Sequence, residues 1–302
     1  MKHFIKVSAA ALMFAGSPLC AEPARYASPD AAVDAVIAAL EARDRDALLT
    51  VFGPENEDVA FTGDADRDVE IWTGFMRDYH RRHSIEMEGP DRAVLHIGRE
   101  DWPFPAPIVM TSGTWSFDGA AARDEVLMRR IGLNELDVID LMHRAVTVQS
   151  TYRQTDHDGD GVMEFASSIL STPGQRDGLY WPSEPGTEES PIGALLARAS
   201  DSGFSIDGAD QEPDPYLGYY FRILQKQGPG APGGEHDYLV NGNMIAGHAL
   251  LAYPAAYGET GIMSFVVGEN GIVYEKDLGA DTLSVAEVID SYDPADGWVP
   301  AE

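Results

Sequence analysis

The residues best suited to chemistry lie in one acidic segment, residues 156–164, with the sequence DHDGDGVME. Aspartates occupy alternate positions and a glycine follows the third, a pattern that wraps oxygen atoms around a hard cation. We therefore predict a calcium site. Its expected ligands are the side chains of Asp156, Asp158, Asp160 and Glu164 and the backbone carbonyl of Val162.

The segment departs from the full twelve-residue calcium loop at its last position. That loop ends on a glutamate that binds with both oxygens, but the twelfth residue counted from Asp156 is Ser167. We therefore expect weak affinity. Because Asp and Gly also favour turns that hold no metal, a metal-free turn is the alternative interpretation.

Histidines offer two further candidate sites. His80 and His83 are three residues apart and could share a helical face as zinc ligands, although the two intervening arginines favour a solvated helix end. His236, Asp237 and His248 could supply a general base with an orienting carboxylate. The sequence has no nucleophile elbow, zinc-protease motif or phosphate-binding glycine loop, so our first hypothesis is a protein that is not an enzyme.

The start of the chain predicts export. Residues 1–21 have the basic start, short apolar stretch and small residues of a signal peptide, with cleavage expected after Ala21. Processing as a lipoprotein at Cys20, the single cysteine, is the alternative. Cleavage after Ala21 would remove Cys20, which excludes disulfides and cysteine nucleophiles from the mature chain. No later stretch is apolar for long enough to cross a membrane, so we predict a periplasmic protein.

The charge of the chain narrows the class of partner. Its formal net charge is −29 at pH 7. A field of this sign repels phosphate backbones, which argues against nucleic-acid binding, and it attracts cations and basic partners. The same charge also keeps a protein soluble without any further role.

Residues 22–118 predict a small domain of helices followed by an antiparallel sheet. Ser28 and Pro29 are typical of a helix start, and Asp46 is the expected cap of a second helix. Ser112-Gly113 is typical of a hairpin turn. The predicted elements are helices beginning at 29, at 47–52 and at 69–80, and strands at 93–97, 108–111 and 114–117.

Residues 119–302 predict a long helix packed on an antiparallel β-meander, so the fold class is α+β. We expect a helix at residues 123–130, an interruption of the helix at Gly132, and a main helix that Asn134 caps. Asn241-Gly242 and Asn270-Gly271 predict hairpin turns. The predicted elements are a short helix at 191–200, strands at 219–224, 238–240, 244–253, 262–267 and 272–275, and a helix at 283–289.

Several short motifs resemble a known family over nearly the whole mature chain. Together they are similar to the bacterial envelope family known as domain of unknown function 2950. The resemblance implies an exported protein and supplies no catalytic residues. The motifs are DWPFP at 101–105, RRIGLNEL at 129–136, DGDG at 158–161, RDGLYW at 176–181 and GYYFR at 218–222.

A second resemblance is partial. Asn134-Glu135 at the start of a helix, followed by Gly218 to Phe221 and by residues 252–273, is similar to the globular part of type IV pilin-like and pseudopilin proteins. This resemblance implies a helix lying across an antiparallel sheet. The apolar, membrane-resident half of a pilin helix is absent, so the resemblance concerns the fold more than the function.

Three functions remain open from the sequence. The first is a non-catalytic envelope binding or assembly protein, whose partner is an unknown envelope protein or cell-wall component. The second is a periplasmic hydrolase that acts on an envelope polymer. The third is a small-molecule-binding protein with its site between the two domains.

Overall fold

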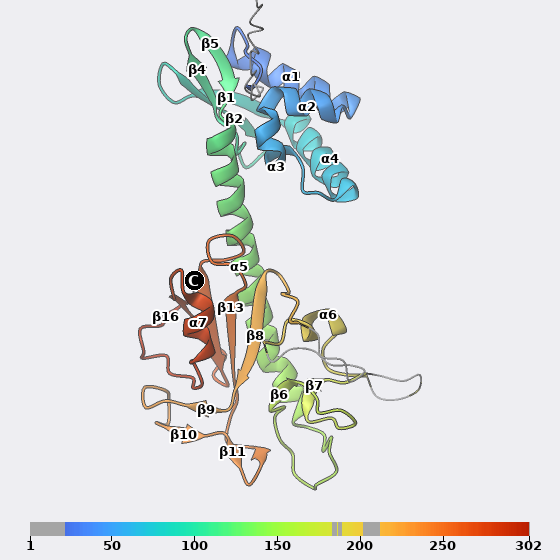
Figure 1. Cartoon of the computed structure of the whole chain (residues 1–302), viewed down its shortest axis with the longest axis vertical. Helices are drawn as coiled ribbons and strands as arrows, with labels where there is room; N and C mark the ends of the chain where they lie inside the picture. Colours follow the sequence, from blue (N-terminus) through green and yellow to red (C-terminus); the bar gives the residue numbers. More distant parts are fainter. Residues whose placement is uncertain (1–21, 183–185, 187–188, 202–211, 302) are drawn as a thin grey trace, which may run out of the picture. The chain divides into compact units, whose positions relative to one another are not determined.

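The computed structural model describes residues 22–182, 186, 189–201 and 212–301, so the predicted signal peptide and Cys20 lie outside it. The chain separates into two compact units, Met1–Val126 and Leu127–Glu302, and the division falls within the long helix α5 (Gly119–Tyr152). Both units combine helices with antiparallel strands (Figure 1), which confirms the α+β class. Within the described residues, no helix is both long enough and apolar enough to cross a membrane.

The helices of the first unit begin at capping residues. α1 (Pro29–Ala42) starts as predicted, because the Ser28 hydroxyl accepts a hydrogen bond from the Ala31 N–H at 3.2 Å. α2 (Arg45–Phe52) is capped by Asp44 and not by Asp46, which lies inside the helix. The remaining helices are a 3₁₀ turn (Pro54–Asn56), α3 (Glu57–Ala60) and α4 (Ala65–Arg81), which starts four residues earlier than predicted because Asp64 caps it.

The first unit's sheet contains a strand that the sequence analysis missed. β1 (His83–Met87) follows α4 directly and pairs antiparallel with β2 (Arg92–Ile97). The order is β1-β2-β4-β5, with β3 (Trp102–Pro103) pairing with β2, β4 at Ile108–Thr111 and β5 at Thr114–Phe117. Ser112 and Gly113 have φ values of 54° and 82°, as the predicted hairpin turn requires.

α5 is one uninterrupted helix, so the predicted break at Gly132 and cap at Asn134 are wrong. A helical glycine costs only about 1 kcal/mol, which neighbouring contacts outweigh. The Asn134 amide donates to the Thr260 carbonyl at 2.9 Å. One Glu135 oxygen accepts from the Ile262 and Met263 N–H groups at 2.8 and 2.9 Å. These bonds are made to a distant segment, which a single sequence does not reveal.

One face of α5 enters the core of the second unit. Val138 and Met142 are fully buried and Tyr152 nearly so, whereas Leu136 is 58% exposed. The helix is therefore covered along one stripe, and the opposite side is exposed at Leu136. The buried stripe packs against apolar residues of the second unit's sheet, among them Phe221, Leu251 and Phe265.

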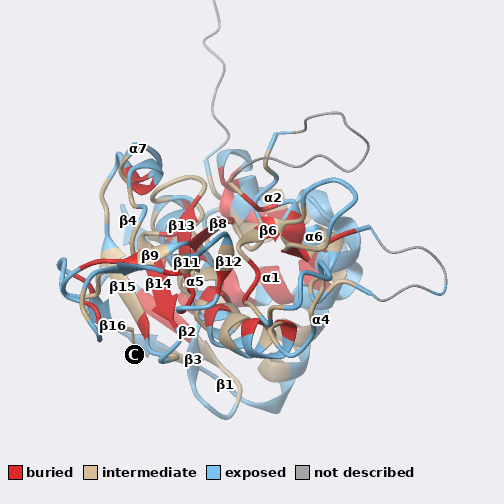
Figure 2. Cartoon of the chain, turned by 90° about the horizontal axis from the view of Figure 1, so that it is seen from below, coloured by how far each residue is buried: buried red, intermediate tan, exposed pale blue. Residues whose placement is uncertain are grey.

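The second unit is built on an antiparallel meander, as predicted. Its order is β16-β15-β14-β13-β8, which leaves β8 at one edge. Burial extends along most of β13 and β14 (Figure 2). The strands are β8 (Tyr219–Leu224), β13 (Ala249–Pro254), β14 (Met263–Gly268), β15 (Val273–Asp277) and β16 (Val299–Pro300).

The predicted strand at 244–253 is interrupted. Residues 245–248 leave the ladder, and the Ile245 and Ala246 N–H groups both donate to the Tyr238 carbonyl. Gly247 has a φ of 142° and lies against the Tyr238 ring, where a Cβ would meet a ring carbon at 2.7 Å. The result is a short hairpin before β13.

Smaller elements surround this meander. β6 (Ser168–Leu170) and β7 (Gly178–Tyr180) pair in parallel. Two short helices are α6 (Ala194–Ala197), which is shorter than the predicted helix at 191–200, and α7 (Thr282–Glu287). The two-residue strands are β9 (Lys226–Gln227), β10 (His236–Asp237), β11 (Leu239–Val240) and β12 (Asn243–Met244).

Candidate metal site and neighbouring cavities

The loop that follows α5 brings three of the predicted ligands together. Asp156, Asp158 and Asp160 each place a carboxylate oxygen within 4.8 Å of the others. Asp158 and Asp160 are exposed and Asp156 is partly buried. This cluster could hold a metal ion, because its oxygens converge at one end of the loop.

Backbone donors shape the turn around Asp156. Its two oxygens accept hydrogen bonds from the N–H groups of Gly159 at 2.7 Å and Gly161 at 2.9 Å. Both glycines have positive φ, 80° and 89°, so the sequence pattern supplies residues that tolerate this turn. The Gly161 bond is the main cause that lowers the pKa of Asp156, and this carboxylate is therefore ionised near neutral pH.

Asp160 links the loop to the β11–β12 hairpin. One of its oxygens accepts from the Val162 N–H at 2.7 Å and the other from the Asn243 side-chain amide at 2.5 Å. Each carboxylate oxygen retains a further lone pair for a cation. An ion bound at the cluster would therefore also stabilise the position of the hairpin.

Glu164 lies outside the group of converging carboxylates. Its Oε2 accepts from the Met244 N–H at 2.7 Å. Burial is the main cause that raises the pKa of Glu164, and the charges of Asp158, Asp160 and Asp177 raise it further. Direct ligation by Glu164 and by the Val162 carbonyl therefore stays a prediction, whereas the approach of the three aspartates is seen in the fold.

Buried contacts hold both ends of the acidic loop. Gln149 is 3% exposed, and its amide forms two hydrogen bonds with the backbone of Ala166, at 2.9 and 3.0 Å. The His157 ring stacks on Tyr152 with centroids 4.2 Å apart. The sequence places a polar glutamine, Gln149, among the apolar residues of this helical stripe, which indicates a buried hydrogen bond. It does not indicate that the partner is the backbone of Ala166.

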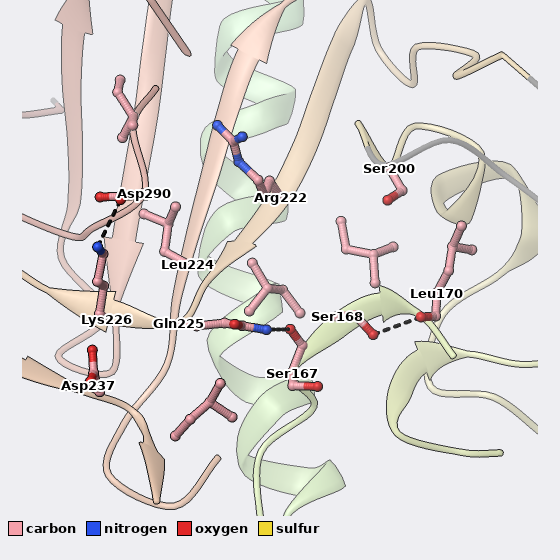
Figure 3. A pocket seen from close by; sticks show the side chains of 14 residues that line it. Ser167, Ser168, Leu170, Ser200, Arg222, Leu224, Gln225, Lys226, Asp237 and Asp290 are labelled. Atoms are coloured by element: carbon pink, nitrogen blue, oxygen red, sulfur yellow. Dashed lines mark hydrogen bonds and ion pairs between the residues drawn. The ribbon is translucent and has the colours of Figure 1, made fainter. Parts of the chain in front are cut away.

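The cavity in Figure 3 lies at the edge of the meander and has a volume of 610 Å³. Arg222 and Leu224 of β8 line one side, and Ser168 and Leu170 of β6 line the other. Lys226 forms an ion pair with Asp290 at 2.8 Å, so those two charges are satisfied within the protein.

Arg222, the other cation in this cavity, also has partners within the protein. It forms an ion pair with Asp201 at 3.2 Å and donates to the carbonyls of Ala286 and Glu287. The two cations that line this cavity are therefore both paired within the protein, and Asp237 adds an exposed carboxylate to its wall.

The histidines predicted as candidate bases are only partly brought together. His236 and His248 line one cavity of 200 Å³, together with Glu269, whereas Asp237 lines the larger cavity at the edge of β8. The predicted pairing of a histidine with Asp237 around one pocket is therefore wrong. Burial, with a contribution from Arg153, lowers the pKa of His248 to about 4.

The zinc pair at His80 and His83, which the sequence made the less favoured alternative to a solvated helix end, lacks the shared helical face that it needs. α4 ends at Arg81, so His80 is helical while His83 begins β1, and the two do not share a helical face. The His83 ring instead stacks on Tyr79, with centroids 3.9 Å apart.

These features define an α+β protein whose second unit presents a candidate cation-binding loop. The chain belongs to the family described as "Protein of unknown function (DUF2950)", whose model matches residues 23–300. Comparisons with curated proteins and with solved structures find no match. The resemblance to pilin-like proteins stays a prediction about the second unit.

Proposed function

We propose that the protein is an exported calcium-binding component of the bacterial cell envelope, which acts by binding an envelope protein or cell-wall component and not by catalysis. The approach of Asp156, Asp158 and Asp160 to within 4.8 Å carries the calcium part of this proposal. The partner is inferred from the predicted export and from the acidic charge of the chain.

The donor atoms favour calcium over other common ions. All three side chains are carboxylates, and oxygen ligands suit calcium, magnesium and manganese better than zinc or copper. Magnesium needs near-ideal octahedral geometry, whereas calcium tolerates an irregular loop. Since Ser167 replaces the bidentate glutamate of the full calcium loop, we expect a Kd on the order of 10⁻⁴–10⁻³ M, the range of extracellular calcium modules.

Calcium would act on the protein by relieving charge repulsion. Three carboxylates held this close repel one another, and a bound dication removes that repulsion. Because Asp160 also bonds Asn243 at 2.5 Å and Glu164 bonds Met244 at 2.7 Å, the ion would stabilise the loop on the hairpin. The role proposed is therefore to stiffen one end of the second unit as a binding surface.

Thermal melting of the purified chain tests the calcium proposal. Calcium at ten times its Kd should stabilise the folded state by about 1.4 kcal/mol, which raises the melting temperature of the second unit by roughly 3–6 °C. Asp158→Asn should reduce this increase strongly. Glu235→Gln, which alters an exposed carboxylate of the same unit outside the loop, should keep it.

Two outcomes would contradict the calcium proposal. One is equal melting in calcium and in a chelator, and the other is equal calcium response in Asp158→Asn and the unaltered chain. Export has its own test: fractionation of cells that express the full chain should recover the cleaved protein in the periplasmic extract. Uncleaved protein in the cytoplasm would contradict that part.

A further inference from the structure

β1 forms one edge of the sheet in the first unit. The strand order β1-β2-β4-β5 gives it a single neighbour, β2. The ladder between the two strands continues one residue beyond each end of β1. At one end the Gly98 N–H donates to the Arg82 carbonyl at 2.9 Å. At the other end the Glu88 N–H donates to the Arg92 carbonyl at 2.9 Å. The backbones of Arg82 and Glu88 therefore face β2.

The outward groups of β1 follow from this alternation. Successive residues of an antiparallel strand direct their N–H and C=O groups to opposite edges. Since Arg82 and Glu88 bond to β2, the backbones of His83, Ile85 and Met87 face away from it. Among the described residues, no strand pairs with this edge. None of the three residues is buried, and Met87 is 49% exposed. β1 therefore presents three N–H and three C=O groups along an open edge.

This edge lacks the features that keep most open strands from pairing. Edge strands are usually protected by shortness, by proline or lysine, or by a bulge. β1 has five residues, HSIEM, with neither proline nor lysine, and its register against β2 runs without a bulge. An edge of this kind can bind another extended chain that adds a strand to the sheet.

The sequence of β1 is complementary to itself in one antiparallel register. When Ile85 lies opposite Ile85 of a second copy, His83 lies opposite Met87, and all the outward-facing residues are paired. Three pairs that exchange two hydrogen bonds each give six bonds. A register centred on Glu86 would place this carboxylate opposite itself, which repulsion disfavours. A register centred on Ser84 would leave Met87 without a strand partner.

Charges at the two ends of β1 favour the same register. It places Arg82 opposite Glu88 of the second copy, once on each side of the two-fold axis. The two side chains are 58% and 49% exposed beside their own partners, Asp101 and Arg92, so both can also contact a second copy. Opposite charges that face each other across two strands stabilise the pairing, whereas like charges destabilise it.

We propose that β1 is a docking edge for a second copy of this chain, which forms a two-fold dimer by antiparallel pairing of the two β1 strands. Six main-chain hydrogen bonds and a small buried area give a weak complex, with a Kd on the order of 10⁻⁵–10⁻⁴ M. The pairing joins the two sheets into one. This proposal does not depend on calcium binding, because it rests on residues of the first unit.

Sedimentation velocity of the mature chain, in a buffer with a calcium chelator, tests the proposal. Between about 5 and 500 μM the average mass should rise from that of one chain towards that of two. Ile85→Pro removes an outward N–H that β2 does not use, so it should weaken the dimer by about tenfold or more while circular dichroism stays unchanged. A chain that stays monomeric over this range would overturn the proposal.

Charge reversal tests the register and does not require proline. Arg82→Glu places a carboxylate opposite Glu88 of the second copy and should weaken the dimer by about tenfold. The double variant Arg82→Glu/Glu88→Arg restores opposite charges and should recover the Kd to within about threefold of the unaltered chain. Glu70→Arg makes the same change of charge at an exposed position of α4 and should leave the dimer unchanged.

Three outcomes of these variants would overturn the proposal. The first is an unchanged dimer in Arg82→Glu or in a folded Ile85→Pro chain. The second is a double variant that dimerises as weakly as Arg82→Glu. The third is a chain that binds unrelated extended peptides along β1 but not a second copy of itself.

Discussion

Replacement of Gln149 by leucine should loosen the acidic loop from the second unit. The Gln149 amide pairs with both the N–H and the carbonyl of Ala166, and Gln149 and Ala166 are 3% and 0% exposed. Leucine has a similar size but forms neither bond. Two unpaired buried groups cost about 2–6 kcal/mol together, and burial of the leucine offsets roughly 1–2 kcal/mol of this. We expect a net loss of about 3 kcal/mol.

Two assays measure this loss. Urea unfolding of the second unit gives the free energy of unfolding, and hydrogen exchange followed by mass spectrometry reports on residues 160–170. Exchange in that segment should accelerate roughly a hundredfold if it opens with the unit. Gln154→Leu is the matched control, because the Gln154 side chain is exposed and donates a hydrogen bond to the Ser150 carbonyl, four residues earlier, at 3.1 Å; it should change stability by less than about 0.5 kcal/mol. Equal effects of the two substitutions would refute the anchoring role of Gln149.

Two further predictions concern the helix and the buried histidine. Glu135→Ala should destabilise the second unit by roughly 2 kcal/mol in urea unfolding, because the N–H groups of Ile262 and Met263 lose their acceptor. Glu135→Gln keeps an acceptor oxygen, so its loss of stability should be about half as large. Equal losses in the two variants would contradict this role of Glu135. The pKa of His248 is about 4 in the folded chain and about 6.5 when unfolded, so the unfolded state binds the proton first as the pH falls. Stability should therefore be unaffected above about pH 6.5 and fall by roughly 3 kcal/mol down to about pH 4. His248→Gln should remove this part of the pH dependence, and an unchanged profile in that variant would count against the assignment.

Local chemistry was enough to predict many of these elements. Ser28 begins α1, and Ser112-Gly113 and Asn241-Gly242 form the turns that their tolerance of positive φ indicates. Local chemistry was also enough to predict the arrangement of Asp156, Asp158 and Asp160. Their alternate spacing and the following glycine produce a tight turn that needs no distant residue, and their carboxylates converge as predicted.

Long-range contacts account for most of the errors. Asn134 resembles a helix cap in sequence, but its amide bonds Thr260, 126 positions later, and the helix continues through it. Asp237 is adjacent to His236 in sequence, yet it lines a different cavity from His248. In each case the deciding partner lies far along the chain, where spacing within a motif carries no information.

Isothermal titration with calcium tests the central claim most directly. The unaltered chain should release or absorb heat in a saturable way, with about one ion bound per chain and a Kd on the order of 10⁻⁴–10⁻³ M. Asp158→Asn should abolish most of this signal, and Glu235→Gln should not. An absence of saturable heat in the unaltered chain, together with a melting temperature that calcium leaves unchanged, would contradict the account.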